Sequence, residues 1–178
     1  MVAIGEIISG LSFIKGLMHG GSKPKLKLDV HQFVGYYRLQ NKEDYYDGSE
    51  SGTYVEIECL IKNTGDKPTT IFRVDLNFVK AEGTQSSGVE YPIKEAKYAF
   101  ESYQSKTPLK IGIGDAIPKT YGFYCPSDLT KGKFEYRFEI EDSFENKLQK
   151  DFKFDDGRVT SNNESYPNLT KENYFGTG

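Results

Sequence analysis

The sequence contains no tryptophan and only two cysteines and two histidines among its 178 residues. A catalytic site needs a convergent set of groups, such as a nucleophile with a base within hydrogen-bond reach. His19 and His31 are not flanked by any recognisable motif, so we expect both to be plain surface or partly buried residues. No CxxC or HxxxH spacing is present to supply zinc ligands. The sequence therefore predicts a protein that is not an enzyme and that uses no cofactor or metal.

A strong positive charge is also missing. The formal net charge is -3 at pH 7, whereas nucleic-acid-binding domains usually carry a clear positive balance. The sequence thus predicts no nucleic-acid partner. The charge is unevenly distributed, however, because the N-terminal 40 residues are basic: they hold Lys15, Lys23, Lys25, Lys27 and Arg38 against Glu6 and Asp29.

The sequence lacks an apolar run long enough to span a membrane. A spanning helix needs roughly 20 predominantly apolar residues, and residues 1–18 are interrupted by Glu6, Lys15 and several glycines. A secretory signal would need a positive n-region and a small-residue cleavage site, and neither is recognisable here. We therefore expect a cytoplasmic protein with reduced thiols.

Aromatic and β-branched residues are abundant, with 13 Tyr and 12 Phe, which favours strands. Apolar and polar residues alternate in seven stretches, and such alternation is typical of antiparallel sheets with one solvated face. The stretches cover residues 25–30, 55–62, 72–78, 109–113, 121–125, 134–141 and 147–156. A further short strand is expected near 98–103. The pattern predicts a mostly β fold, an antiparallel two-sheet β-sandwich.

Each stretch also predicts which side chains face the core. The inward residues are expected to be Val55, Ile57, Cys59 and Ile61; Phe72, Val74, Leu76 and Phe78; Leu109, Ile111 and Ile113; Phe134, Tyr136, Phe138 and Ile140; and Leu148, Phe152 and Phe154.

The first 20 residues show a different period, which predicts an N-terminal amphipathic helix. Its apolar stripe holds Ile4, Ile7, Ile8, Leu11 and Ile14, and the glycines and proline of "GGSKP" end it. Lys23, Lys25 and Lys27 follow. Together these eight residues form a possible interaction surface: the stripe packs on the sandwich, or the helix and lysines lie on an anionic membrane. Alternating lysines on a first strand are also a guard against edge-to-edge pairing.

Three segments follow from these patterns: the helix at 1–20, a β-sandwich domain at 25–155 and a polar tail at 156–178. We expect the tail to be mobile unless its aromatic residues dock on the domain.

Three turn motifs suggest a family. They are "IKNTGDKPTTI" (61–71), "LKIGIGDAIPKTYGFYC" (109–125) and "FEYRFEIEDSFENKLQKDF" (134–152), the last with Asp142 and Asn146 in its turn. Over residues 53–154 the chain resembles prokaryotic immunoglobulin-like domains of the cell-adhesion-related (CARDB-like) kind. The resemblance implies an immunoglobulin-like sandwich that serves as a spacer or binding module.

The two cysteines must be weighed against that resemblance. Immunoglobulin domains join an early and a late strand by a disulfide, and Cys59 and Cys125 both lie on expected inward faces. The absence of tryptophan and the expected reducing compartment favour two buried free thiols instead.

The sequence therefore indicates a non-catalytic intracellular interaction module, with a protein partner or self-association. One alternative is a peripheral membrane protein anchored by the N-terminal helix and the following lysines. Another is a β-sandwich that binds carbohydrate or calcium. The candidate groups for that last reading are Tyr36, Tyr37, Tyr45, Tyr46 and Tyr54, and the acidic segments 43–50 and 141–146.

Overall fold

The computed structural model describes residues 23–39, 51–82, 98–102 and 108–172. The helix expected over residues 1–20 and the acidic segment 43–50 lie outside them. The described chain is mostly β, and its strands run in the order β1 (Leu26–Arg38), β2 (Gly52–Asn63), β3 (Thr69–Glu82), β4 (Glu101–Ser102), β5 (Leu109–Ile111), β6 (Ala116–Cys125), β7 (Lys133–Asp142), β8 (Lys147–Asp155), β9 (Arg158–Ser161), β10 (Glu164–Tyr166) and β11 (Thr170–Glu172).

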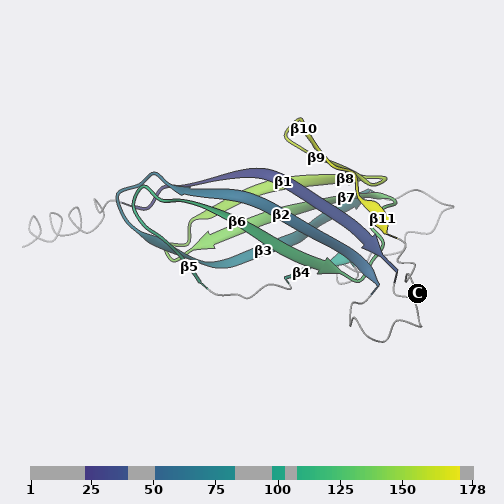
Figure 1. Cartoon of the computed structure of the whole chain (residues 1–178), viewed down its shortest axis with the longest axis horizontal. Helices are drawn as coiled ribbons and strands as arrows, with labels where there is room; N and C mark the ends of the chain where they lie inside the picture. The colour runs from purple at the N-terminus through teal and green to yellow at the C-terminus, as the bar shows by residue number, and fades with distance from the viewer. Residues whose placement is uncertain (1–22, 40–50, 83–97, 103–107, 173–178) are drawn as a thin grey trace, which may run out of the picture.

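The strands form two sheets that pack together as a β-sandwich (Figure 1). Sheet A has the order β11-β1-β2-β6-β4, and sheet B has the order β10-β9-β8-β7-β3-β5. Neighbouring strands are antiparallel except β1 and β11, which run parallel. Each of the seven alternating stretches contains a strand, although β5 covers only residues 109–111 of the stretch 109–113, and β4 supplies the short strand expected near 98–103.

Alternation predicts the core well where the strands pair regularly. On β2, Val55, Ile57, Cys59 and Ile61 are all fully buried, and β7 buries Tyr136, Phe138 and Ile140 in the same way. Aromatic rings fill the space between the sheets, as where the Phe33 ring lies 4.9 Å from that of Phe152. Full burial of such a side chain is worth about 1.5–3 kcal/mol. The buried side chains between the two sheets are therefore the main source of the stability of the domain.

Two residues expected to face inward are exposed instead. The β3–β7 register shifts between Ile71 and Arg73, and a bulge of this kind turns one side chain to the other face. Ile71 is therefore buried while Phe72 is 49% exposed. Ile113 lies beyond the end of β5, in a turn, and is 61% exposed. The prediction of inward positions was wrong for Phe72 and Ile113.

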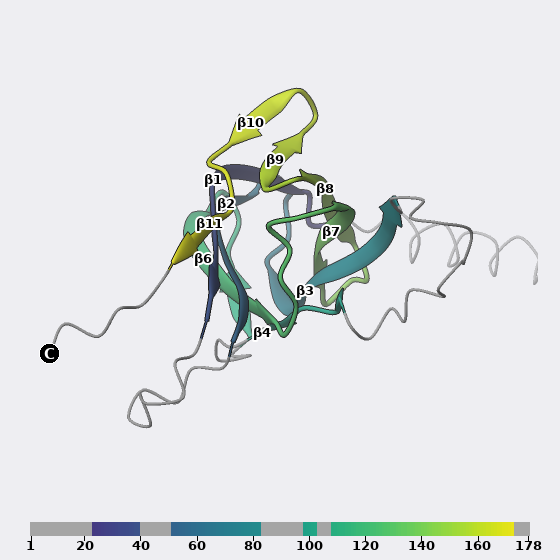
Figure 2. The ribbon, with the colours of Figure 1, turned by 90° about the vertical axis from the view of Figure 1, so that its right-hand side faces the viewer.

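The polar tail, expected to be mobile unless its aromatic residues dock on the domain, adds strands β9, β10 and β11 to the two sheets as far as residue 172. After β8 the chain forms the β9–β10 hairpin on sheet B and then crosses to sheet A as β11 (Figure 2). Tyr166 docks, with its ring centroid 6.1 Å from that of Phe33 and 5.6 Å from that of Phe152. Val159 and Leu169 are buried beside it. The tail thus closes one open side of the sandwich.

The cysteines are buried free thiols, as predicted. Cys59 and Cys125 lie on neighbouring strands of the same sheet, and Cys125 pairs with Thr53, six residues before Cys59. At about 3.4 Å per residue that offset is roughly 20 Å, too far for a disulfide. Burial raises the pKa of Cys59 to about 12 and also raises that of Cys125.

Two lysines occupy inward-facing positions on strand segments that lack a second described neighbour. Lys119 on β6 stands opposite the buried Cys59, and Lys150 on β8 stands opposite the buried Phe138. Lys119 remains exposed, and Lys150 reaches the carboxylate of Glu164 at 2.6 Å. Inward-pointing charges on sheet edges block the addition of a further strand, so these edges are poor sites for strand pairing with another chain.

Candidate interaction surface

Three turns meet at one end of the sandwich, where the described chain begins at Lys23. The β2–β3 and β5–β6 turns are joined by backbone hydrogen bonds: the Asn63 N–H donates to the Asp115 carbonyl at 2.9 Å, and the Gly114 N–H donates to the Asn63 carbonyl at 3.0 Å. The β7–β8 turn joins them through the Ser143 N–H, which donates to the Thr70 carbonyl at 2.8 Å. The three turn motifs of the sequence therefore form one surface.

Asn63 organises the first turn from within. Its side chain is buried, and Oδ1 accepts from the N–H of Gly65 at 3.0 Å and of Lys25 at 3.3 Å. Its Nδ2 donates to the Lys67 carbonyl at 2.7 Å. A buried amide with these partners fixes both the turn and the segment that enters β1.

Gly65 is required for that close approach. A Cβ at this position would lie less than 3.0 Å from backbone atoms of Lys23, Pro24 and Lys25. Thr64 adds two hydrogen bonds to the Lys25 carbonyl, from its N–H at 2.8 Å and from its hydroxyl at 3.1 Å. The positions of Lys23 and Lys25 at this end are therefore set by the turn beneath them.

The β5–β6 turn presents Ile113 to solvent. Asp115 Oδ2 accepts from the Gly112 N–H at 2.6 Å, and Gly114 has φ +76°, as at the third position of a type II turn. Only glycine adopts that conformation without strain. Ile113, at the second position, is held outward and is 61% exposed.

In the β7–β8 turn, the side chain of Asp142 fixes the backbone that holds Phe144 outward. The carboxylate is fully buried and accepts four hydrogen bonds: from the N–H of Phe144 and of Asn146, both at 2.9 Å, and from Thr69 Oγ1 and Asn146 Nδ2, both at 3.0 Å. Glu145 takes a positive φ of 62°. Phe144 projects from this fixed turn and is 47% exposed.

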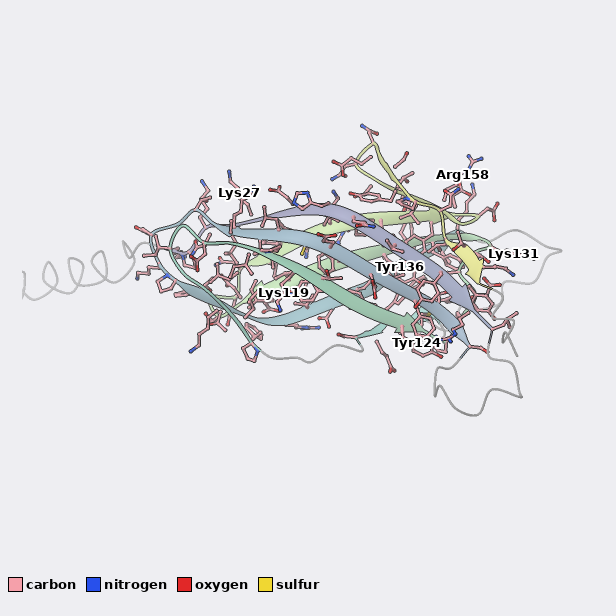
Figure 3. The ribbon with its side chains drawn as sticks, in the orientation of Figure 1. Lys27, Lys119, Tyr124, Lys131, Tyr136 and Arg158 are labelled. Atoms are coloured by element: carbon pink, nitrogen blue, oxygen red, sulfur yellow. The ribbon has the colours of Figure 1, made fainter. Side chains whose placement is uncertain are left out.

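We call this surface the basic end and define it by five lysines and three exposed apolar residues: Lys23, Lys25, Lys27, Lys67 and Lys110, with Phe72, Ile113 and Phe144. Three turn carboxylates, Asp66, Asp115 and Glu145, and the buried carboxylate of Asp142 lie among them. Figure 3 shows Lys27 near this end, and Lys131 and Arg158 toward the opposite one. The end has a positive balance in a chain whose net charge is negative.

The outer face of sheet B differs, because its charges neutralise one another. Its ion pairs are Lys80 with Glu135, Lys153 with Glu135, Arg137 with Asp151, Lys147 with Glu139 and Arg73 with Asp75. Of the five lysines of the basic end, none is ion-paired to a carboxylate within the described part of the chain. Lys119, Lys131 and Arg158 also form no ion pair in that part of the chain, but the basic end gathers five such lysines.

The structure places the predicted surface residues as follows. Lys23, Lys25 and Lys27 are exposed together at the basic end, whereas the apolar stripe of Ile4, Ile7, Ile8, Leu11 and Ile14 lies outside the described residues. Sequence reasoning missed Ile113 and Phe144 as surface residues. The available signal was an apolar residue inside a turn sequence, in "GIGD" and "DSFEN".

A tyrosine row on sheet A was only partly visible in the sequence. Tyr36, Tyr54 and Tyr124 are neighbours across β1, β2 and β6. The Tyr54 ring is stacked on Tyr36 at 5.4 Å and packs against Tyr124 at 5.0 Å. One face of Tyr54 is therefore covered by the Tyr36 ring, and the tilted Tyr124 ring packs beside it, so Tyr54 offers a poor platform for stacking a sugar. Tyr45 and Tyr46 lie outside the described residues.

Groups for chemistry or metal binding do not converge in the described residues. His31 is exposed on β1, and the carboxylate of Asp142 in the segment 141–146 is used by its own turn. Within residues 23–39, 51–82, 98–102 and 108–172, no group of three or more His, Cys, Asp or Glu could hold a metal ion. In the same ranges no helix has the length and apolar character to cross a bilayer.

Comparisons with known proteins give no family. No family model matches the chain, and no curated protein is similar to it in sequence.

Proposed function

We propose that this chain is a non-catalytic interaction module of the immunoglobulin-like kind, which binds another macromolecular surface through the basic end. The observation that carries the proposal is the exposure of Ile113 and Phe144 on turns that buried hydrogen bonds hold rigid. A free apolar side chain in a mobile loop can withdraw from water, but these two are held outward. Exposed apolar residues gathered at one site favour a binding role.

The strand order supports the immunoglobulin-like part of the proposal. Immunoglobulin sandwiches have strands A, B, E and D in one sheet and C, F and G in the other. Taken in chain order, the corresponding strands here are β1, β2, β6 and β4 in sheet A, and β3, β7 and β8 in sheet B. Strand β5 and the tail strands β9, β10 and β11 are additions at the edges.

The chemistry of the buried polar groups supports a binding role over catalysis. A nucleophilic thiol needs a lowered pKa, whereas burial raises the pKa of both cysteines. The buried side chains of Asn63 and Asp142 form hydrogen bonds with the backbone and side chains of their own turns. Unpaired cysteines also fit a reducing compartment, so the proposal places the protein in the cytoplasm.

Binding would gain from covering the apolar residues. Full burial of an Ile or Phe side chain is worth about 1.5–3 kcal/mol. Ile113 and Phe144 expose about half of their surface, so together they contribute roughly 2–3 kcal/mol when a partner covers them. That amount changes a dissociation constant by about two orders of magnitude.

The test is site-specific photo-crosslinking in cells that express the chain. A benzoylphenylalanine at position 113 is compared with one at position 79, because Val79 is also exposed but lies far along β3 from the basic end. We expect an adduct from position 113 and none above background from position 79. Equal adducts, or none from either position, would refute the proposal. The adduct's mass distinguishes a protein partner, a second copy of the chain and a lipid.

A further inference from the structure

The charge and apolar residues of the basic end indicate what it binds. Resting on the proposed function, we infer that the basic end docks on an anionic lipid bilayer, with the lysines over the headgroups and Ile113 and Phe144 in the interface. The two apolar residues project from separate rigid turns at the same end as the lysines. This is the arrangement that a flat, negatively charged and apolar-cored surface requires.

Charge fixes the orientation of docking. The chain as a whole carries a net charge of -3, so most of its surface has no attraction for an anionic membrane. The basic end differs because it gathers five lysines that form no ion pair in the described residues, whereas Lys131 and Arg158, which also lack an ion pair there, lie toward the opposite end. Each basic residue close to an anionic surface strengthens binding about five-fold.

Residue types favour a membrane over a protein partner. Lysine is depleted from protein–protein interfaces, which are centred on a packed aromatic cluster. At the basic end the exposed apolar residues instead lie on three separate segments, Phe72 on β3 and Ile113 and Phe144 in different turns. The lysines of this end have long side chains that extend well toward headgroups. A stable protein interface also needs about 800 Å² from each partner, more than three exposed apolar side chains supply.

The chain connectivity adds a second contribution. Lys23 leads directly from residues 1–22, so the amphipathic sequence of Ile4, Ile7, Ile8, Leu11 and Ile14 is tethered to the basic end. Any membrane contact that this sequence makes occurs at high effective concentration next to the basic end, so the two contacts reinforce each other.

The test is flotation of the full chain with vesicles of two compositions, phosphatidylcholine alone and an equal mixture of phosphatidylcholine and phosphatidylglycerol. We expect flotation with the anionic vesicles only. The variant I113S/F144S should bind about a hundred-fold more weakly, and K25E/K110E should lose detectable binding. These residues are exposed, so the thermal midpoints should stay near that of the wild type.

Matched controls remove the same kinds of group elsewhere. L39S/V79S deletes two exposed apolar residues away from the basic end, and K131E/R158E reverses two charges toward the opposite end. We expect both controls to bind within about two-fold of the wild type.

Two results would overturn the inference. The first is that the wild type does not float with anionic vesicles; an adduct between position 113 and a protein would then leave the proposed function intact and remove only the lipid. The second is equal flotation of I113S/F144S, K25E/K110E and the wild type, because binding would then depend on residues 1–22 alone.

Discussion

The docking of the tail on β1 makes a quantitative prediction at Gly35. A Cβ at this position would lie less than 3.0 Å from Leu169 Cδ2 and 3.4 Å from Phe33 Cε1. The clash is with a buried side chain, since Leu169 is only 6% exposed. Overpacking of this kind costs about 1–3 kcal/mol, so we expect Gly35→Ala to destabilise the domain by that amount. Leu169→Ala leaves a cavity and should cost about 2–5 kcal/mol.

The double variant Gly35→Ala/Leu169→Ala tests whether the two residues are in direct contact, because changes at independent sites would add. Removing the Leu169 side chain creates the space that the new Cβ needs, so the pair should cost about 1–2 kcal/mol less than the sum of the single changes. For a domain of this size each kcal/mol lowers the thermal midpoint by about 2–4 °C.

The assay is urea unfolding followed by circular dichroism and tyrosine fluorescence, because the chain has no tryptophan. Thr170→Ala is the control, since Thr170 is exposed next to Leu169 and should change stability by less than about 0.5 kcal/mol. Additive single changes would show that Leu169 does not lie against Gly35. If Leu169→Ala cost no more than the control, the tail would not be part of the core.

Three further predictions concern buried and paired groups. Asp142→Asn disturbs the four hydrogen bonds of that carboxylate and should cost about 1–3 kcal/mol in urea unfolding, with Asp66→Asn near zero; equal values would contradict the role of Asp142. Because burial raises the pKa of Cys59 to about 12, iodoacetamide should alkylate it only in urea, and alkylation of the native protein, seen by mass, would contradict its burial. The hydrogen bond from Lys147 lowers the pKa of Glu139, so its stabilisation is present above the unfolded pKa of about 4.3 and is lost as the pH falls through the folded value. Glu139→Gln should therefore flatten the loss of stability on acidification, and unchanged pH curves would contradict this.

The charge pattern also explains how the open edges of the sandwich avoid pairing with other chains. Lys119 and Lys150 stand at inward-facing positions of β6 and β8, where a continuous sheet would have an apolar residue. The β3 edge is interrupted by register shifts at both ends, between Ile71 and Arg73 and between Phe78 and Lys80. These features are typical guards against strand addition.

The sequence predicts the candidate site only in part. Lys23, Lys25 and Lys27 could be chosen because they follow an amphipathic stretch, and the structure exposes them together. Ile113 was assigned to the core because it continues the alternation of Leu109 and Ile111. The alternation rule assumes a continuous strand, but the turn fixed by Gly112 and Asp115 ends β5 at Ile111, two residues before Ile113. The inward prediction for Phe72 fails for a related reason: the bulge between Ile71 and Arg73 arises from the pairing of β3 with β7, which the pattern within β3 does not contain.

Local pattern alone determined the strands of this protein and most of its core, because period-two alternation acts through the pleat of each strand and needs no knowledge of its neighbours. It also determined the turns, since Asn63, Gly114 and Asp142 fix their own backbone by short-range hydrogen bonds or a positive φ. Only the tertiary structure decided that these turns meet at one end, and that Tyr166 and Leu169 dock on β1. Those contacts join residues far apart in the chain, so they depend on strand order and register, which neighbouring residues do not encode.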